Sequence, residues 1–200
     1  MNTVSPKSLP LESLISLMID GIVMSSDATI VEPMLINLDD KQNYYISDLN
    51  LASVYDPEFG DFLFEYTRET SKMMESKRSV LLFPAIYDTE AKSLGVVDFI
   101  DFNEEIPDHP FVIAIIDDSE KLEAKIFELR GIPGTCLLSI HRDDIKASPS
   151  FLEPLIEHWE VDETVKPGMF HQTKPEDEPR YDPMIDMSWH SISELMPVSH

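Results

Sequence analysis

Residues 111–140 constrain the fold more than any other part of the chain. Their first segment, residues 111–116, is an unbroken run of apolar and mostly β-branched side chains. A strand without polar alternation is typical of a sheet that is covered on both faces, as in parallel or mixed sheets. We therefore expect this strand at the centre of a sheet, with helices above and below it.

The middle of this stretch predicts a helix. Three consecutive residues that can cap a helix come first: Asp117, Asp118 and Ser119. Three apolar residues then recur at i, i+4 and i+7: Leu122, Ile126 and Leu129. Acidic caps suit the positive end of a helix dipole, and Gly131 suits the left-handed conformation that ends a helix. The apolar run at residues 135–140 then predicts a second strand.

The residues Arg130-Gly131-Ile132-Pro133, between a predicted amphipathic helix and an apolar strand, resemble the thioredoxin fold. In that fold a Gly-x-Pro turn with a cis proline separates the second helix from the third strand. Residues 148–159 look like its C-terminal helix. The resemblance implies that Gly131 and Pro133 are structural turn residues. It implies no redox activity, because the chain has no Cys-x-x-Cys pair and a single cysteine, Cys136.

The other segments predict one α/β or α+β domain over residues 1–160, with a central mixed β-sheet flanked by helices. Apolar stripes at helical spacing predict helices at residues 8–24, 56–76 and 150–159. Strands are expected at residues 29–38, 44–46, 80–87 and 94–102, with Pro33 and Pro84 marking bulges or sheet edges. The last two strands form an extra β-hairpin relative to the thioredoxin fold, with Val97, Phe99 and Phe102 turned to the core.

The composition changes at Glu160. Residues 160–200 hold nine acidic residues, three basic residues and five prolines, which is typical of a tail and places residues 161–200 outside the domain. Four apolar residues at i, i+4, i+7 and i+11 predict a short amphipathic helix at residues 184–196: Ile185, Trp189, Ile192 and Met196. Such a helix would dock in a groove of another protein or fold back on its own domain.

The chain carries 38 acidic and 15 basic residues, a net charge of −23. Nucleic acids and anionic membranes attract basic surfaces, so the charge disfavours direct binding to either. It favours a partner protein with a basic surface, although acidic surfaces also aid solubility. Residues 79–118 contain nine acids and one base, Lys92. We therefore predict a partner-binding surface there and in the tail, at Asp98, Asp101, Glu104, Glu105, Ile185, Trp189, Ile192 and Met196.

The sequence predicts no catalytic, cofactor-binding or metal-binding residues. Asp108 with Glu123 and Lys125 matches in letters a pattern of metal-dependent nucleases, but in the predicted helix Glu123 and Lys125 would point about 200° apart. A carboxylate metal site built from Asp98, Asp101, Asp117 and Asp118 is disfavoured because the first two would project from opposite faces of a strand. The chain has no HExxH motif, zinc-ligand spacing, Gly-rich phosphate loop or GxSxG elbow.

These observations favour a soluble, redox-inactive, non-enzymatic protein that serves as an adaptor, assembly factor or inhibitor. One alternative is a nucleic-acid mimic, whose carboxylates occupy the basic cleft of a nucleic-acid enzyme. A second is a divalent-metal-dependent, nuclease-like enzyme. A cytoplasmic location is expected, because a lone cysteine within an apolar run fits a reducing compartment and because no signal peptide or membrane-spanning stretch is evident.

Overall fold

The computed structural model describes residues 10–25, 30–39, 43–48, 57–101, 108–131, 138–158, 164–171 and 188–191. The helices are α1 (Leu11–Ser25), α2 (Pro57–Met73) and α3 (Glu153–His158), the last preceded by the 3₁₀ helix η3 (Pro149–Leu152). The strands are β1 (Ile30–Val31), β2 (Met34–Leu38), β3 (Asn43–Asp48), β4 (Arg78–Asp88), β5 (Ser93–Val96), β6 (Ile100–Asp101), β7 (Pro110–Asp117), β8 (Leu122–Arg130), β9 (Leu138–His141) and β10 (Ser188–Ser191).

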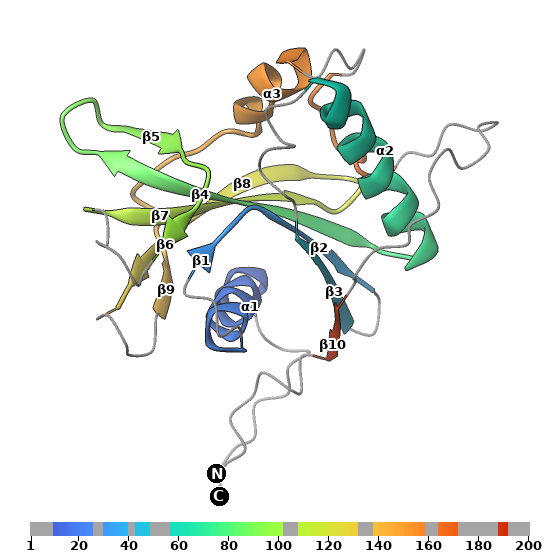
Figure 1. Cartoon of the computed structure of the whole chain (residues 1–200), viewed down its shortest axis with the longest axis horizontal. Coiled ribbons are helices and arrows are strands. Elements are labelled where there is room, and N and C mark those ends of the chain that lie inside the picture. The colour runs from blue at the N-terminus through green and yellow to red at the C-terminus, as the bar shows by residue number, and fades with distance from the viewer. Residues whose placement is uncertain are drawn as a thin grey trace, which may run out of the picture.

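These elements form a single α+β domain around a curled sheet (Figure 1). The strand order is β10-β3-β2-β4-β7-β8-β9, with β5 paired to β4, while β1 and β6 form a separate two-stranded sheet. Each of these pairings is antiparallel. The expectation of a mixed sheet was wrong for the strands described. Short hairpins can join antiparallel neighbours, so this sheet needs no helical crossover between β7 and β8.

The central strand β7 confirms the expectation from its unbroken apolar run, because every residue from Pro110 to Asp117 is buried. One side of β7 faces α1, and its core contains Val112, Ala114 and Ile116 together with Ile15 and Met18. The other side faces α2 and α3, with Phe111, Ile113 and Ile115 in a second core. In Figure 1 α1 lies within the curl of the sheet, and α2 and α3 cover its opposite face.

The predicted helix that followed β7 is instead the strand β8. Residues 117–121 make a tight turn, in which the Asp118 carboxylate accepts hydrogen bonds from the amides of Glu120 and Lys121. The residues interpreted as helix caps are therefore turn residues, which the same side chains also favour. Three residues at spacing two pack toward the second core: Leu122, Ala124 and Ile126. The apolar spacing thus fits a strand, and the segment that was interpreted as the helix before the Gly-x-Pro turn is β8.

The expectation of a bulge or a sheet edge was wrong for Pro84, because β4 is an interior strand whose register with β7 is continuous through this residue. Pro33 lies between β1 and β2, yet β2 is an interior strand with neighbours on both sides. Pro84 lies within β4, where its carbonyl accepts a hydrogen bond from the Val97 amide on the β5 side. The N–H and C=O of a strand residue point to the same side, so the amide that proline lacks would face the junction between the ends of β2 and β5. Central strand β4 therefore accommodates it.

Several other predictions can be compared with the structure. Helices α1 and α2, the β2–β3 hairpin and the β4–β5 hairpin are confirmed. Val97 packs on the core, but Phe99 is 53% exposed, so its predicted burial was wrong. Ser148 caps the 3₁₀ helix η3 that precedes α3, its hydroxyl accepting from the Ser150 amide, so the cap is not Ser150 itself. Phe102 and Pro133 lie outside the described residues, and Gly131 lies just after β8.

The expected boundary at residue 160 falls too early for the core. Met169 and Phe170 are buried in the core that α2 and α3 cover. Asp117 accepts hydrogen bonds from the amides of Gly168 (2.8 Å) and Phe170 (3.0 Å), and Arg68 donates to the Met169 carbonyl (3.0 Å). Residues 164–171 are thus held between the end of β7 and α2, and they belong to the domain.

Candidate functional site

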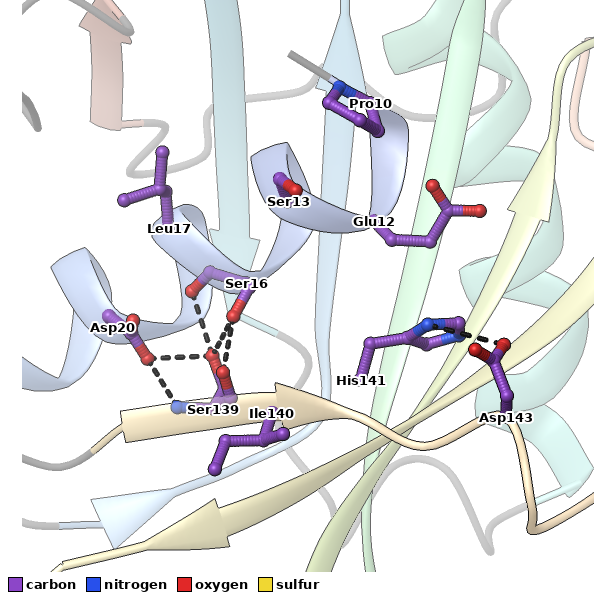
Figure 2. Close-up of a pocket in the computed structure, with 10 residues that line it drawn as sticks. All are labelled: Pro10, Glu12, Ser13, Ser16, Leu17, Asp20, Ser139, Ile140, His141 and Asp143. Carbon is purple, nitrogen blue, oxygen red and sulfur yellow. Dashed lines mark hydrogen bonds and ion pairs between the residues drawn. The ribbon is translucent and has the colours of Figure 1, made fainter.

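A cavity of about 570 Å³ lies between α1 and β9, at one end of the sheet (Figure 2). On α1, Glu12, Ser16 and Asp20 follow at intervals of four and so share one helix face. On β9, Ser139 and His141 follow at an interval of two and so share one strand face. The complete lining is Pro10, Glu12, Ser13, Ser16, Leu17, Asp20, Ser139, Ile140, His141 and Asp143.

One end of the cavity holds a compact hydrogen-bond network. Asp20 Oδ1 accepts from the Ser139 amide (2.7 Å) and lies 2.6 Å from Ser139 Oγ. Ser139 Oγ is also 2.8 Å from the Ser16 carbonyl oxygen, and Ser16 Oγ donates to the Ser139 carbonyl. The last strand of a sheet normally leaves such backbone groups unpaired. Helix α1 therefore covers the outer side of β9 at Ser139.

The Asp20 carboxyl is the titrating group of this network. Partial burial raises the pKa of Asp20 above its usual 3.8, and the two hydrogen bonds from Ser139 lower it by less. The folded chain thus binds this proton more tightly than the unfolded chain does. The stability contributed by the protonated form is present below pH 3.8, and it is lost as the pH rises through the raised pKa.

We expect Asp20→Asn to gain stability relative to the unmodified chain as the pH rises from about 3.5 to about 6.5. The amide keeps an oxygen that accepts from Ser139 but carries no charge to desolvate. Urea unfolding across this pH range measures the difference in unfolding free energy. Asp144→Asn is a control of opposite sign, because Arg142 lowers the pKa of Asp144 to about 2 and the charged form is the stabilising one. A pH-independent difference for Asp20→Asn would contradict this account.

The other end of the cavity contains an imidazole and two further carboxylates. His141 Nδ1 lies 3.5 Å from Asp143 Oδ1, and the His141 ring packs 5.4 Å from the ring of Phe127. Glu12 pairs with Lys125 Nζ at 3.1 Å. A hydrogen bond with its own backbone, and then the bond with Lys125, lower the pKa of Glu12. This end of the cavity therefore presents charged groups to solvent.

The arrangement suits binding better than nucleophilic catalysis. A serine nucleophile needs an adjacent base that takes its proton. Among the contacts of the described residues, Ser16 and Ser139 bond to one another, Ser139 also bonds to Asp20, and neither serine bonds to His141. The three carboxylates and three hydroxyls of the lining are instead groups that accept hydrogen bonds from a cationic or polar group.

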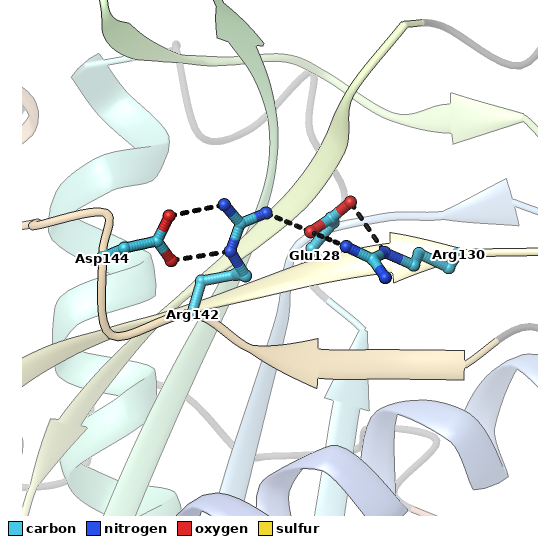
Figure 3. Close-up of polar contacts among 4 residues, drawn as sticks. All are labelled: Glu128, Arg130, Arg142 and Asp144. Carbon is cyan, nitrogen blue, oxygen red and sulfur yellow. Dashed lines mark hydrogen bonds and ion pairs between the residues drawn. The ribbon is translucent and has the colours of Figure 1, made fainter.

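An ionic network joins two residues of β8, Glu128 and Arg130, to two residues that follow β9, Arg142 and Asp144, and it is neutral as a unit (Figure 3). Glu128 accepts two bonds from Arg130, at 2.8 and 3.0 Å, and a further bond from Arg142. Arg142 also donates two hydrogen bonds to the Asp144 carboxylate, from Nε at 2.7 Å and from Nη2 at 2.6 Å. Two guanidinium groups thus meet two carboxylates, and their hydrogen bonds lower the pKa values of both acids. These arginines do not form an open anion site.

The structure does not bring the predicted partner-binding residues together. Asp98 is exposed in the loop after β5, and Asp101 is half-buried in β6. Trp189 lies in β10, beyond β3 at the far end of the strand order, so residues 188–191 are a strand and not part of the expected helix at 184–196. Five predicted residues lie outside the described part of the chain: Glu104, Glu105, Ile185, Ile192 and Met196.

The nuclease-like pattern also separates in space. Glu123 and Lys125 are extended in β8, contrary to the expected helix, and Lys125 reaches Glu12 on α1. Glu123 lies opposite Ile116 near the end of β7, whereas Asp108 precedes the start of β7. Eight residues of strand separate these levels, which is about 27 Å. Asp117 was one of the four aspartates weighed as a carboxylate metal site. Its carboxylate instead accepts hydrogen bonds from three backbone amides.

Sequence reasoning missed the cavity residues, although a signal was present. Glu12, Ser16 and Asp20 form a polar line along a helix whose other face is strongly apolar. What the sequence could not supply was the strand that this line faces, because Ser139 is 119 residues from Asp20.

Within the described residues, no group of three or more His, Cys, Asp or Glu side chains is arranged to hold a metal ion. No helix in this part of the chain is both long and apolar enough to cross a membrane. Comparison of the chain with known protein families, curated proteins and solved structures found no match.

Proposed function

We propose that this chain is a non-enzymatic binding protein, an adaptor, assembly factor or inhibitor, that holds a partner protein with a basic surface. One observation carries the proposal: five acidic residues lie on the β4–β5 hairpin, on the segment that follows it and just before β7. We call this group the acidic rim, and it consists of Asp88, Glu90, Asp98, Asp101 and Asp108. Four of the five are exposed, and Asp101 is half-buried.

The strand pairing explains why residues twenty apart in sequence share this rim. Ile86 near the end of β4 lies opposite Pro110 at the start of β7, and the Tyr87 amide bonds to the His109 carbonyl. Asp88 and Asp108 therefore leave the sheet at the same end. Lys92 is the one basic residue in the described segments between Ile86 and Pro110. Carboxylates gathered in this way produce a negative potential that attracts and orients a cationic partner.

The test compares two full-length variants from which the same charge has been removed. The rim variant carries Asp88→Asn, Glu90→Gln, Asp98→Asn and Asp108→Asn. The control variant carries four substitutions at exposed acids elsewhere: Glu75→Gln, Glu120→Gln, Glu153→Gln and Glu157→Gln. Affinity capture from the native host identifies the partner, and surface plasmon resonance with that purified partner then measures both variants.

We expect the rim variant to bind about tenfold more weakly, mainly through slower association, because steering by charge acts on the association rate. The control variant should change the affinity by about twofold or less, because its charges lie away from the rim. Equal losses of affinity in both variants would show that the net charge alone determines binding, and this would contradict a defined binding surface. Unchanged affinity in the rim variant would exclude the rim.

The nucleic-acid mimic remains the second candidate, since the rim's exposed carboxylates could stand in for phosphates. It predicts that the captured partner itself binds DNA or RNA and that either polymer competes with this chain. It also predicts that affinity falls steeply between low and moderate salt. A partner that shows no competition and only a shallow salt dependence would favour the adaptor.

A further inference from the structure

Strand β10 closes one end of the sheet with the C-terminal part of the chain. It pairs antiparallel with the outer side of β3, in the register Ser188–Ile46, Trp189–Tyr45, His190–Tyr44 and Ser191–Asn43. On its other side β3 pairs with β2 over five positions. Without β10, β3 would be the last strand and would present a row of unpaired backbone groups, the kind of edge to which another extended chain can add.

The attachment of β10 is one of the shortest pairings of the long sheet. It comprises four residue pairs, as do β4–β5 and β8–β9, whereas β4 and β7 share eight. Of its residues, Ser-Trp-His-Ser, only Trp189 belongs to the β-branched and aromatic classes that are enriched in strands. Sixteen residues, 172–187, connect it to the described segment that ends at His171, and closing such a loop opposes the pairing entropically.

We propose that the outer side of β3 is a strand-exchange site, at which β10 of a second copy of this chain takes the place of the chain's own β10. The exchanged strand would make the same backbone hydrogen bonds in the same register. The β10–β3 bonds that are lost within each chain are therefore replaced by identical bonds between the two chains. Reciprocal exchange of identical elements closes a symmetric dimer.

The net charge gives this exchange a distinctive salt dependence. Two chains that each carry −23 repel one another, and added salt screens that repulsion. The exchanged dimer should therefore increase with salt, whereas binding of a basic partner at the acidic rim should decrease. The exchange is independent of the proposed function, and the two can fail separately.

Two single-cysteine chains test the exchange, both in the background Cys136→Ser. One carries Tyr45→Cys and the other Trp189→Cys, at positions that lie directly opposite in the register. Opposite residues of an antiparallel pair have Cα atoms about 4.5–5.5 Å apart, which is within disulfide range. The two chains are mixed at high concentration, oxidised mildly and resolved on a non-reducing gel. A cross-link between different chains can form at this register only if β10 of one copy lies on β3 of the other.

The matched control replaces Trp189→Cys by Ser191→Cys, which is two residues out of register with Tyr45. We expect about fivefold or more cross-linked heterodimer from the in-register pair, with an increase in salt and a decrease when excess unmodified chain competes. A double substitution, Trp189→Pro with His190→Pro, should abolish the dimer seen by light scattering. Successive amides of a strand point to opposite sides, so one of these two amides is directed at β3. Proline has no amide hydrogen, and the double substitution therefore removes that bond whichever residue donates it.

Equal cross-linking in and out of register would overturn the proposal, as would a dimer that persists in the double-proline chain. A second in-register pair, Tyr44→Cys with His190→Cys, provides an independent test if the first pair of substitutions destabilises the chains. Urea unfolding of each variant confirms that the compared chains are folded. Failure of both in-register pairs in folded chains would exclude exchange at this edge.

Discussion

Replacing Asp117 by alanine is expected to lower the free energy of unfolding by about 3–5 kcal/mol. This carboxylate is fully buried and accepts bonds from the amides of Ser119, Gly168 and Phe170, at 3.0, 2.8 and 3.0 Å. Its removal leaves buried N–H groups without an acceptor, and each such group is unfavourable by about 1–3 kcal/mol. Equilibrium urea unfolding, followed by tryptophan fluorescence and circular dichroism, measures the loss.

The neighbouring residue supplies a matched control. Asp118 also accepts from two amides, those of Glu120 and Lys121, but in an exposed turn where water can replace the carboxylate. We expect Asp118→Ala to lower the unfolding free energy by about 1 kcal/mol or less. Similar losses for both aspartates would contradict the role of Asp117 in holding residues 164–171 against β7.

Replacing Phe83 by alanine is expected to lower the unfolding free energy by about 3–5 kcal/mol. The Phe83 side chain is fully buried in β4, and its ring packs edge-on against the ring of Phe151 with centroids 5.6 Å apart. Truncation removes apolar surface from the core and leaves a cavity between the sheet and η3. Both effects are destabilising, and urea unfolding measures their sum.

Phe99→Ala is the control for this prediction, because Phe99 is 53% exposed in the loop between β5 and β6. Exposed substitutions usually change stability by about 0.5 kcal/mol or less. The sequence alone placed Phe99 in the core, so the pair of variants also discriminates between the sequence-based and the structural assignments. A large loss for Phe99→Ala would favour the sequence-based one.

The elements that could be predicted from the sequence are those whose local pattern allows one conformation. The unbroken apolar run of β7 specified a strand buried on both faces, and the stripe of α1 specified a helix with one apolar face. Asp56 followed by Pro57 indicated the start of α2, which begins at Pro57. The turns between β2 and β3 and between β4 and β5 were also recognisable from their polar residues.

Residues 122–130 show why local pattern was insufficient elsewhere. Leu122 and Ile126 satisfy a helical period of four and also a strand period of two, since four is a multiple of two. Whether residues 122–130 form a helix or a strand depends on their neighbours in the sheet. Strand β7 needs a hydrogen-bond partner on the side away from β4, and β9 pairs with the far side of β8. Pairing with two neighbours satisfied the backbone of β8 as a strand, so tertiary context overrode the helix-like spacing.

The candidate site was predictable in its chemistry but not in its geometry. The excess of acids between residues 79 and 118 was visible in the sequence, and it supplied the acidic rim. The cavity between α1 and β9 was not visible, because Asp20 and Ser139 meet only when the sheet curls around α1. The same holds for Asp117 and residues 164–171, which are about fifty residues apart in the chain.

The sequence by itself determined the charge, the buried strand β7 and the two long helices, because these depend on composition or on the period of neighbouring side chains. Only the tertiary structure decided that β8 is a strand, that residues 164–171 belong to the core and that β10 covers β3. The physical reason is that these features depend on backbone groups finding hydrogen-bond partners far away in sequence. No local pattern records which distant segment supplies those partners.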